Sequence, residues 1–235
     1  LFSIALIGAM YSFALSVSIS TIIFMALVIY QKKVPDLFQK DARKDLLLTT
    51  FFINLLFILV FLGLQYTTAG NMAVIIFLQL LFSYLYFNVF GSDQLSPMHT
   101  IGAVIMGVGA LTVLIPDDLS FNKGDLIILI AAALAPFANL YQKRARTYVS
   151  SESILAFRNI IALPILFLIA YLSEPMPSLE KLIEATPYIL AIGILVFGVS
   201  KVLYIEALHR ISITKVSAML ALPPLFTLIF TYFIL

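Results

Sequence analysis

Three charged residues, Arg158, Lys201 and Glu206, lie inside apolar runs of about 20 residues each. A helix of that length crosses the hydrocarbon layer of a membrane, where a charged side chain costs about 2.5–3.5 kcal/mol. A cation in such a place can face a water-filled cavity and bind an anionic group. Alternatively, the basic side chains extend to the inner membrane surface, and one of them pairs with Glu206. We keep both interpretations, with Arg158 and Glu206 as candidates for a structural ion pair.

Neutral polar side chains form a second group of candidates. The amides of Asn54, Gln79 and Asn139 lie in apolar runs, where facing lipid would leave their hydrogen bonds unmade. Each amide therefore either bonds a neighbouring helix or contacts a bound molecule. Tyr204 either lines a cavity or anchors its helix at the membrane interface. These four residues and Lys201 are our candidates for a substrate-binding cavity.

The sequence shows no catalytic set of residues. The two histidines, His99 and His209, lie near the ends of apolar runs and far apart in the chain. The chain has no cysteine, which excludes disulfides and thiol chemistry. It also has no phosphate-binding glycine-rich loop and no metal-ligand spacing. We therefore expect no cofactor, no metal and no enzymatic activity.

The apolar runs define the elements that position these residues. Hydrophobic residues make up 62% of the chain and charged residues 11%, compared with about 25% charged in a soluble domain. This composition predicts an all-α fold, a polytopic bundle of about eight membrane-spanning helices. The predicted spans are 8–30, 46–66, 71–90, 97–115, 125–142, 153–172, 187–208 and 213–235. Within them, Pro136, Pro223 and Pro224 can kink the helices, as hinges or as static packing kinks.

Lys and Arg gather in alternate loops between the spans. Ten of the 14 basic residues lie in loops 31–45, 142–152 and 209–215. Cytoplasmic loops are enriched in Lys and Arg, so we expect these three loops in the cytoplasm and the protein in the plasma or inner membrane. The basic residues occupy short loops rather than one face. We therefore expect membrane lipid and a small-molecule substrate as partners, and no nucleic acid.

A repeat underlies the spans. A shift of about 144 residues aligns Gly63 with Ala207 and Thr68 with Ser212, and it aligns 81–83 (LFS) with 225–227 (LFT). The shift moves each span onto the fifth span after it, so the second copy is inverted in the membrane. Inverted repeats are typical of secondary transporters, whose binding site lies near the membrane midplane between the repeats. We assign residues 1–116 to the first repeat and 117–235 to the second.

Short motifs in both halves resemble the drug/metabolite transporter superfamily, EamA type, over nearly the whole chain. The second half reads LYIEAL at 203–208 and PPLFT at 223–227, and the first half reads QLLFS at 79–83 and DQLS at 93–96. Two positions differ from the family pattern, because Asp93 stands where Glu is usual and Gln79 where Pro is frequent.

The resemblance implies two inverted repeats of five spans that move small metabolites by alternating access. Family members usually have ten spans, so we expect this chain to hold the second to the ninth, without the first and the last. The family cavity is generally lined by the spans that match 46–66, 71–90, 125–142, 187–208 and 213–235. The span 153–172 is peripheral there, which favours Lys201 over Arg158 as a substrate ligand.

Together, these features predict a secondary transporter or exchanger for a small polar metabolite. No loop is long enough for a nucleotide-hydrolysing domain, so the energy must come from a gradient or from exchange. Two alternatives remain: a membrane enzyme or lipid-handling protein that uses Glu206 with His209, and a structural membrane subunit.

Overall fold

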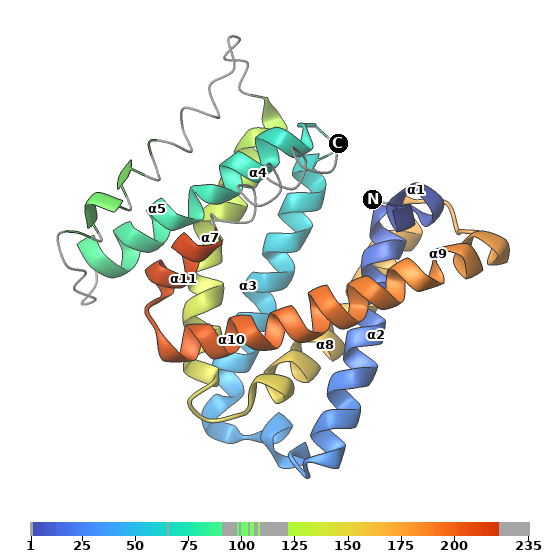
Figure 1. Ribbon diagram of the computed structural model, residues 1–235, viewed down its shortest axis with the longest axis horizontal. Helices are drawn as coiled ribbons and strands as arrows, with labels where there is room; N and C mark the ends of the chain where they lie inside the picture. The colour runs from blue at the N-terminus through green and yellow to red at the C-terminus, as the bar shows by residue number, and fades with distance from the viewer. Residues whose placement is uncertain are drawn as a thin grey trace, which may run out of the picture. The chain divides into compact units, whose positions relative to one another are not determined.

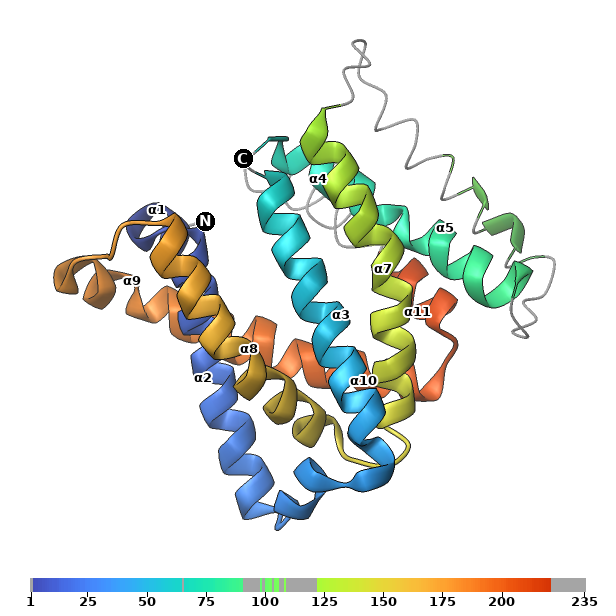
Figure 2. The same cartoon turned by 180° about the vertical axis from the view of Figure 1, so that it is seen from behind.

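The described residues are helical almost throughout (Figure 1; Figure 2). The computed structural model describes residues 2–64, 66–90, 98, 100–102, 104–105, 108 and 122–220. Within these ranges there is no strand, so the predicted all-α fold is confirmed. Most of the predicted spans 97–115 and 213–235, including Pro223 and Pro224, lies outside the described residues. The helices are α1 (Phe2–Ile7), α2 (Ala9–Tyr30), η1 (Val34–Phe38), α3 (Lys40–Leu64), α4 (Ala69–Phe77), α5 (Gln79–Tyr84), η2 (Leu85–Val89), α7 (Lys123–Ala145), α8 (Ser151–Ser173), α9 (Leu179–Ala191), η3 (Ile192–Val199), α10 (Ser200–Arg210) and α11 (Ile213–Met219).

Four of the described helices are long and apolar enough to cross a membrane. They are α2, α7, α8 and the continuous helix Leu179–Arg210, which consists of α9, η3 and α10. The predicted span 46–66 falls in α3, and the predicted span 71–90 is divided among α4, α5 and η2. The composition and these helices make the chain an integral membrane protein with a helical bundle fold.

The long helix begins at Leu179 rather than near residue 187, where the sequence predicted it. Ser178 has the extended backbone of an N-cap residue. The first turns carry charged residues such as Glu180, which resemble a loop when hydropathy alone is considered. They form a helix because the buried face of α9, with Ala185 and Ile189, packs on α1.

The chain forms two compact units. The first comprises residues 1–50 and 141–209, and the second comprises residues 51–140 and 210–235. Each unit therefore takes segments from both halves of the sequence. Its stability depends on contacts between residues that are far apart along the chain.

In the first unit, α2 and α8 pack along their lengths in opposite directions. Near the middle, Asn159 Nδ2 donates a hydrogen bond to Ser20 Oγ over 3.1 Å. At one end, the backbone N of Met10 donates to Glu174 Oε1 over 3.0 Å. This carboxylate satisfies donors that every helix leaves open in its first turn, and its negative charge faces the positive end of the α2 dipole.

At the other end of α2 and α8, two basic loops meet. Lys33 Nζ lies 3.9 Å from Glu152 Oε2. Ser153 Oγ donates to Asp36 Oδ2 over 3.0 Å. The loop after α2 and the loop before α8 are therefore at the same end of this unit, as expected of two loops on one side of a membrane.

Gly193 allows the long helix to approach α2 closely. A Cβ atom at position 193 would lie 2.7 Å from Ile19 Cβ and 2.8 Å from the backbone O of Ser16. Side chains bring no hydrophobic gain when they leave lipid for a helix interface, so close packing of small residues drives such contacts.

In the second unit, α3 and α7 approach through a pair of glycines. A Cβ atom at Gly124 would lie 2.5 Å from the backbone O of Gly63. Along the same helices, the rings of Phe52 and Phe137 stack with centroids 6.0 Å apart. Tyr86 of η2 also contacts Phe137, with 4.9 Å between centroids. The aromatic contacts thus join three segments of this unit.

We predict that Gly193→Val destabilises the protein by about 1–3 kcal/mol, because the added carbons overlap the α2 backbone. Thermal unfolding of the purified protein in detergent measures the effect. Gly102→Val is the matched control, since a Cβ at Gly102 would meet no atom within 4 Å. Equal unfolding midpoints for the two variants would contradict the close approach.

Candidate functional site

Arg158 is a buried cation in α8, with 8% of its surface exposed. Its Nη1 donates a hydrogen bond to Gln142 Oε1 on α7 over 3.2 Å. Among the described residues, no carboxylate forms an ion pair with Arg158. A guanidinium has five N–H donors, so a neutral amide satisfies only part of its bonding capacity.

Lys201 is a half-buried cation in α10. Its Nζ lies 6.0 Å from the centre of the Tyr204 ring, at the outer limit of a cation–π contact. No carboxylate of the described chain forms an ion pair with it. The site residues Lys201 and Tyr204 are therefore in contact, as neighbours on one helix face.

Arg158 and Lys201 lie at the same level of the first unit. Ser151 at the start of α8 bonds Glu206 of α10, and the two helices run in opposite senses (Figure 1). Arg158 follows Ser151 by about two turns, and Lys201 precedes Glu206 by about one and a half turns. Both steps lead away from the basic loops, so the two cations lie at similar depth along their helices.

Glu206 forms an ion pair with Arg146, which was not among the candidates predicted from the sequence. Its Oε1 accepts hydrogen bonds from Arg146 Nε over 2.8 Å and from Ser151 Oγ over 2.6 Å. The structural ion pair expected between Arg158 and Glu206 is thus replaced by a pair between Arg146 and Glu206. The reason is depth along α8: Glu206 lies level with Ser151, too far from Arg158 for a direct contact.

The three candidate amides belong to the second unit. Asn139 is 6% exposed in α7 and is already bonded. Asn54 in α3 and Gln79 at the start of α5 are half-buried, and neither side chain has a hydrogen bond within the described chain. Pro136, a candidate hinge, lies inside α7 and is fully buried.

Several polar side chains in these helices were not among the predicted site residues. Gln142 was placed where the span 125–142 meets the loop 142–152, and it is 1% exposed and accepts a hydrogen bond from Arg158. Ser12, Ser16 and Ser20 recur every four residues along α2 and are buried. That spacing places them on one helix face, and it could have identified a polar seam. Ser16 Oγ is buried without a hydrogen-bond partner in the described chain.

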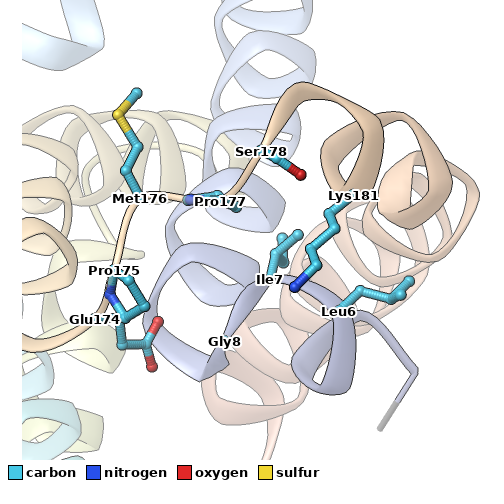
Figure 3. Close-up of a pocket in the computed structure, with 9 residues that line it drawn as sticks. All are labelled: Leu6, Ile7, Gly8, Glu174, Pro175, Met176, Pro177, Ser178 and Lys181. Carbon is cyan, nitrogen blue, oxygen red and sulfur yellow. The ribbon is translucent and has the colours of Figure 1, made fainter.

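A pocket of about 390 Å³ opens at the other end of the first unit (Figure 3). It lies between the break from α1 to α2 and the connection from α8 to α9. None of the predicted site residues lines it. Its lining residues are Leu6, Ile7, Gly8, Glu174, Pro175, Met176, Pro177, Ser178 and Lys181.

Two of the residues that line this pocket, Gly8 and Glu174, have a structural role at the start of α2. Gly8 has a φ of +85° where α1 ends and α2 begins, a conformation that side chains disfavour. A Cβ there would also collide with the Glu174 carboxylate, which caps α2. Among the described residues, no group of three or more His, Cys, Asp or Glu side chains could hold a metal ion.

The chain matches one protein family twice. The model of the EamA-like transporter family matches residues 3–115 and again residues 122–235. No solved structure matches the chain significantly.

Two relatives carry transporter names. The Uncharacterized transporter YoaV of Bacillus subtilis is 22% identical over 213 residues, which cover 88% of this chain and 72% of the relative. An Uncharacterized transporter of Methanothermobacter thermautotrophicus is 27% identical over 200 residues, which cover 81% of this chain and 57% of the relative.

We predict that Glu206→Gln destabilises the protein by about 1 kcal/mol, because Arg146 loses its charged partner at a partly exposed site. Chemical or thermal unfolding of the purified protein measures the change. Glu180→Gln serves as the control, since Glu180 is exposed at the start of α9. An unchanged stability of Glu206→Gln would show that the pair is too hydrated to contribute.

Proposed function

The chain belongs to the EamA-like transporter family, and we propose that it moves a small polar metabolite across a membrane by alternating access, as a secondary transporter or exchanger. The double match to the family, over residues 3–115 and 122–235, is the observation that carries this proposal. Two copies of one domain in a single chain are expected of transporters that alternate between two openings.

The loop charges support an inverted arrangement of the two copies. Spans that align by the shift of about 144 residues are separated by an odd number of crossings, so they run in opposite directions. In such transporters, half-molecules rock around a shared site near the midplane. Polar residues such as Asn54, Gln79 and Lys201 lie in apolar helices, where they are costly unless they serve packing or binding.

The energy source would be a gradient or an exchanged molecule. The described connections 31–39, 146–150, 174–178 and 211–212 are short and hold no nucleotide-binding domain. The alternative of a membrane enzyme relied on Glu206 with His209 as an acid–base pair. The Glu206 carboxylate is instead bonded to Arg146 and Ser151, which does not favour that alternative.

Reconstitution tests the transport proposal. We expect proteoliposomes that contain the full-length protein to take up or exchange at least one compound from a panel of labelled neutral, cationic and anionic metabolites. Empty liposomes provide the background. If folded protein moves no compound faster than empty liposomes, the proposal is wrong.

Cysteine labelling tests the proposed topology, and the chain is suited to it because it has no cysteine of its own. We expect Lys40→Cys and Arg144→Cys to react with a membrane-impermeant maleimide only after the cells are opened, since both loops would be cytoplasmic. Glu180→Cys, at the opposite end of the first unit, should react in intact cells. All three positions are exposed. Labelling of Lys40→Cys and Arg144→Cys on different sides would exclude the arrangement.

A further inference from the structure

The charged side chains of the first unit lie at two depths along the helices. At one depth cations are paired with carboxylates, and at the other they are not, within the described residues. At the level of the basic loops, cations and carboxylates alternate and bond one another, as in Arg146 with Glu206 and Lys33 with Glu152. A core cluster that contains Ile154, Leu155 and Ile205 lies next along the helices. Beyond it come Arg158 and Lys201, two cations that form no ion pair with a carboxylate of the described residues.

Four carboxylates in the described part of the first unit form side-chain contacts, and all four are engaged elsewhere. Asp36 accepts hydrogen bonds from the loop before α8. Glu152 pairs with Lys33, Glu206 pairs with Arg146, and Glu174 caps α2. Within the described residues, none of them contributes to the level of Arg158 and Lys201.

The neutral groups at this level do not balance two positive charges. Gln142 Oε1 accepts one hydrogen bond from Arg158, and the Tyr204 ring lies at the limit of contact with Lys201. Two cations at the same depth of one unit repel each other, and Arg158, which is buried, has also lost hydration. Such a pair lowers the stability of the folded protein, and it is retained where function needs it.

We propose that Arg158 and Lys201 together bind a carboxylate or phosphate group of the transported molecule, with Gln142 holding the guanidinium in place. This inference rests on the proposed transport function and adds the chemical class of the substrate. A planar guanidinium can present two parallel donors to an oxyanion, and an ammonium adds a compact positive charge. An anion with two oxygens would satisfy donors that the amide leaves open.

The first test introduces a negatively charged side chain next to Arg158 by substituting Gln142 with Glu. Gln142→Glu keeps the shape of the side chain and places a carboxylate oxygen where Gln142 Oε1 now accepts a hydrogen bond from Arg158 Nη1 over 3.2 Å. We expect the substrate-free variant to unfold at a higher temperature than the wild type. We also expect its flux of anionic metabolites to fall at least about tenfold, because the added carboxylate competes for the cations.

The second test removes one charge. Lys201→Gln should lower the flux of anionic metabolites at least about tenfold, while its unfolding temperature stays equal or rises. Lys201→Arg keeps the charge and should retain more of the flux. Lys123→Gln is the matched control, because Lys123 is exposed at the start of α7, and we expect it to transport as the wild type does.

The outcomes separate this inference from the transport proposal. Proteoliposomes with wild-type protein that move only neutral or cationic metabolites would overturn the anion site and leave the transport function standing. Undiminished anion flux in Lys201→Gln or in Gln142→Glu would also overturn it, and would assign the two cations to contacts with the membrane surface. The absence of flux for every compound would end both proposals together.

Discussion

In the hydrocarbon region of a membrane, a polar group that finds no partner within the protein cannot obtain one from water. The backbone meets this constraint by forming helices. Side chains meet it by bonding across helices, as Asn159 does with Ser20 and Ser83 with Ser217. Helix ends meet it through groups such as the Glu174 carboxylate, which accepts hydrogen bonds from the first residues of α2.

The same constraint explains how the helices come together. Leaving lipid brings an apolar side chain no hydrophobic gain, so close contact and polar bonds must stabilise the assembly. Gly193 against α2, and Gly63 against Gly124, bring backbones together where any larger residue would collide. These contacts join segments from both halves of the sequence within each compact unit. In a protein built from a duplicated domain, such an exchange makes each unit dependent on both copies.

Within the described part of the chain, the buried Arg158 and the half-buried Lys201 have no carboxylate partner, whereas buried charges are usually paired. Arg146 shows what compensation looks like in the same unit, because its guanidinium meets the Glu206 carboxylate and the Ser151 hydroxyl. Two cations without a carboxylate partner among the described residues would suit the recognition of a molecule of opposite charge by a transporter. Binding of an anion would then supply the missing partner. The unfavourable interactions of the two cations in the empty site would be relieved on binding, which would favour the bound state.

The sequence by itself determined the class of the protein, the approximate positions of the four described helices that are long enough to cross a membrane, and the family. It did so because hydropathy and loop charge are properties of consecutive residues. Long apolar runs become membrane-spanning helices, and the Lys and Arg content of the loops predicts the side of the membrane on which each loop lies. It also identified Lys201 and Arg158 as unusual, since a charge within an apolar run is visible in one dimension. It misjudged the start of the long helix, because the charged first turns of α9 become helical by packing on α1.

Only the tertiary structure decided which groups meet. Glu206 could have paired with any of several cations, and the choice of Arg146 follows from the level at which α10 passes α8. Gln142 stood at the predicted border between a span and a loop, and the continuation of α7 to Ala145 brings its side chain to Arg158. Partners depend on the rotation of each helix about its axis and on the crossing of helices distant in sequence. The rotations and crossings of the helices are set by close packing between distant segments, so they cannot be predicted from a local pattern of residues.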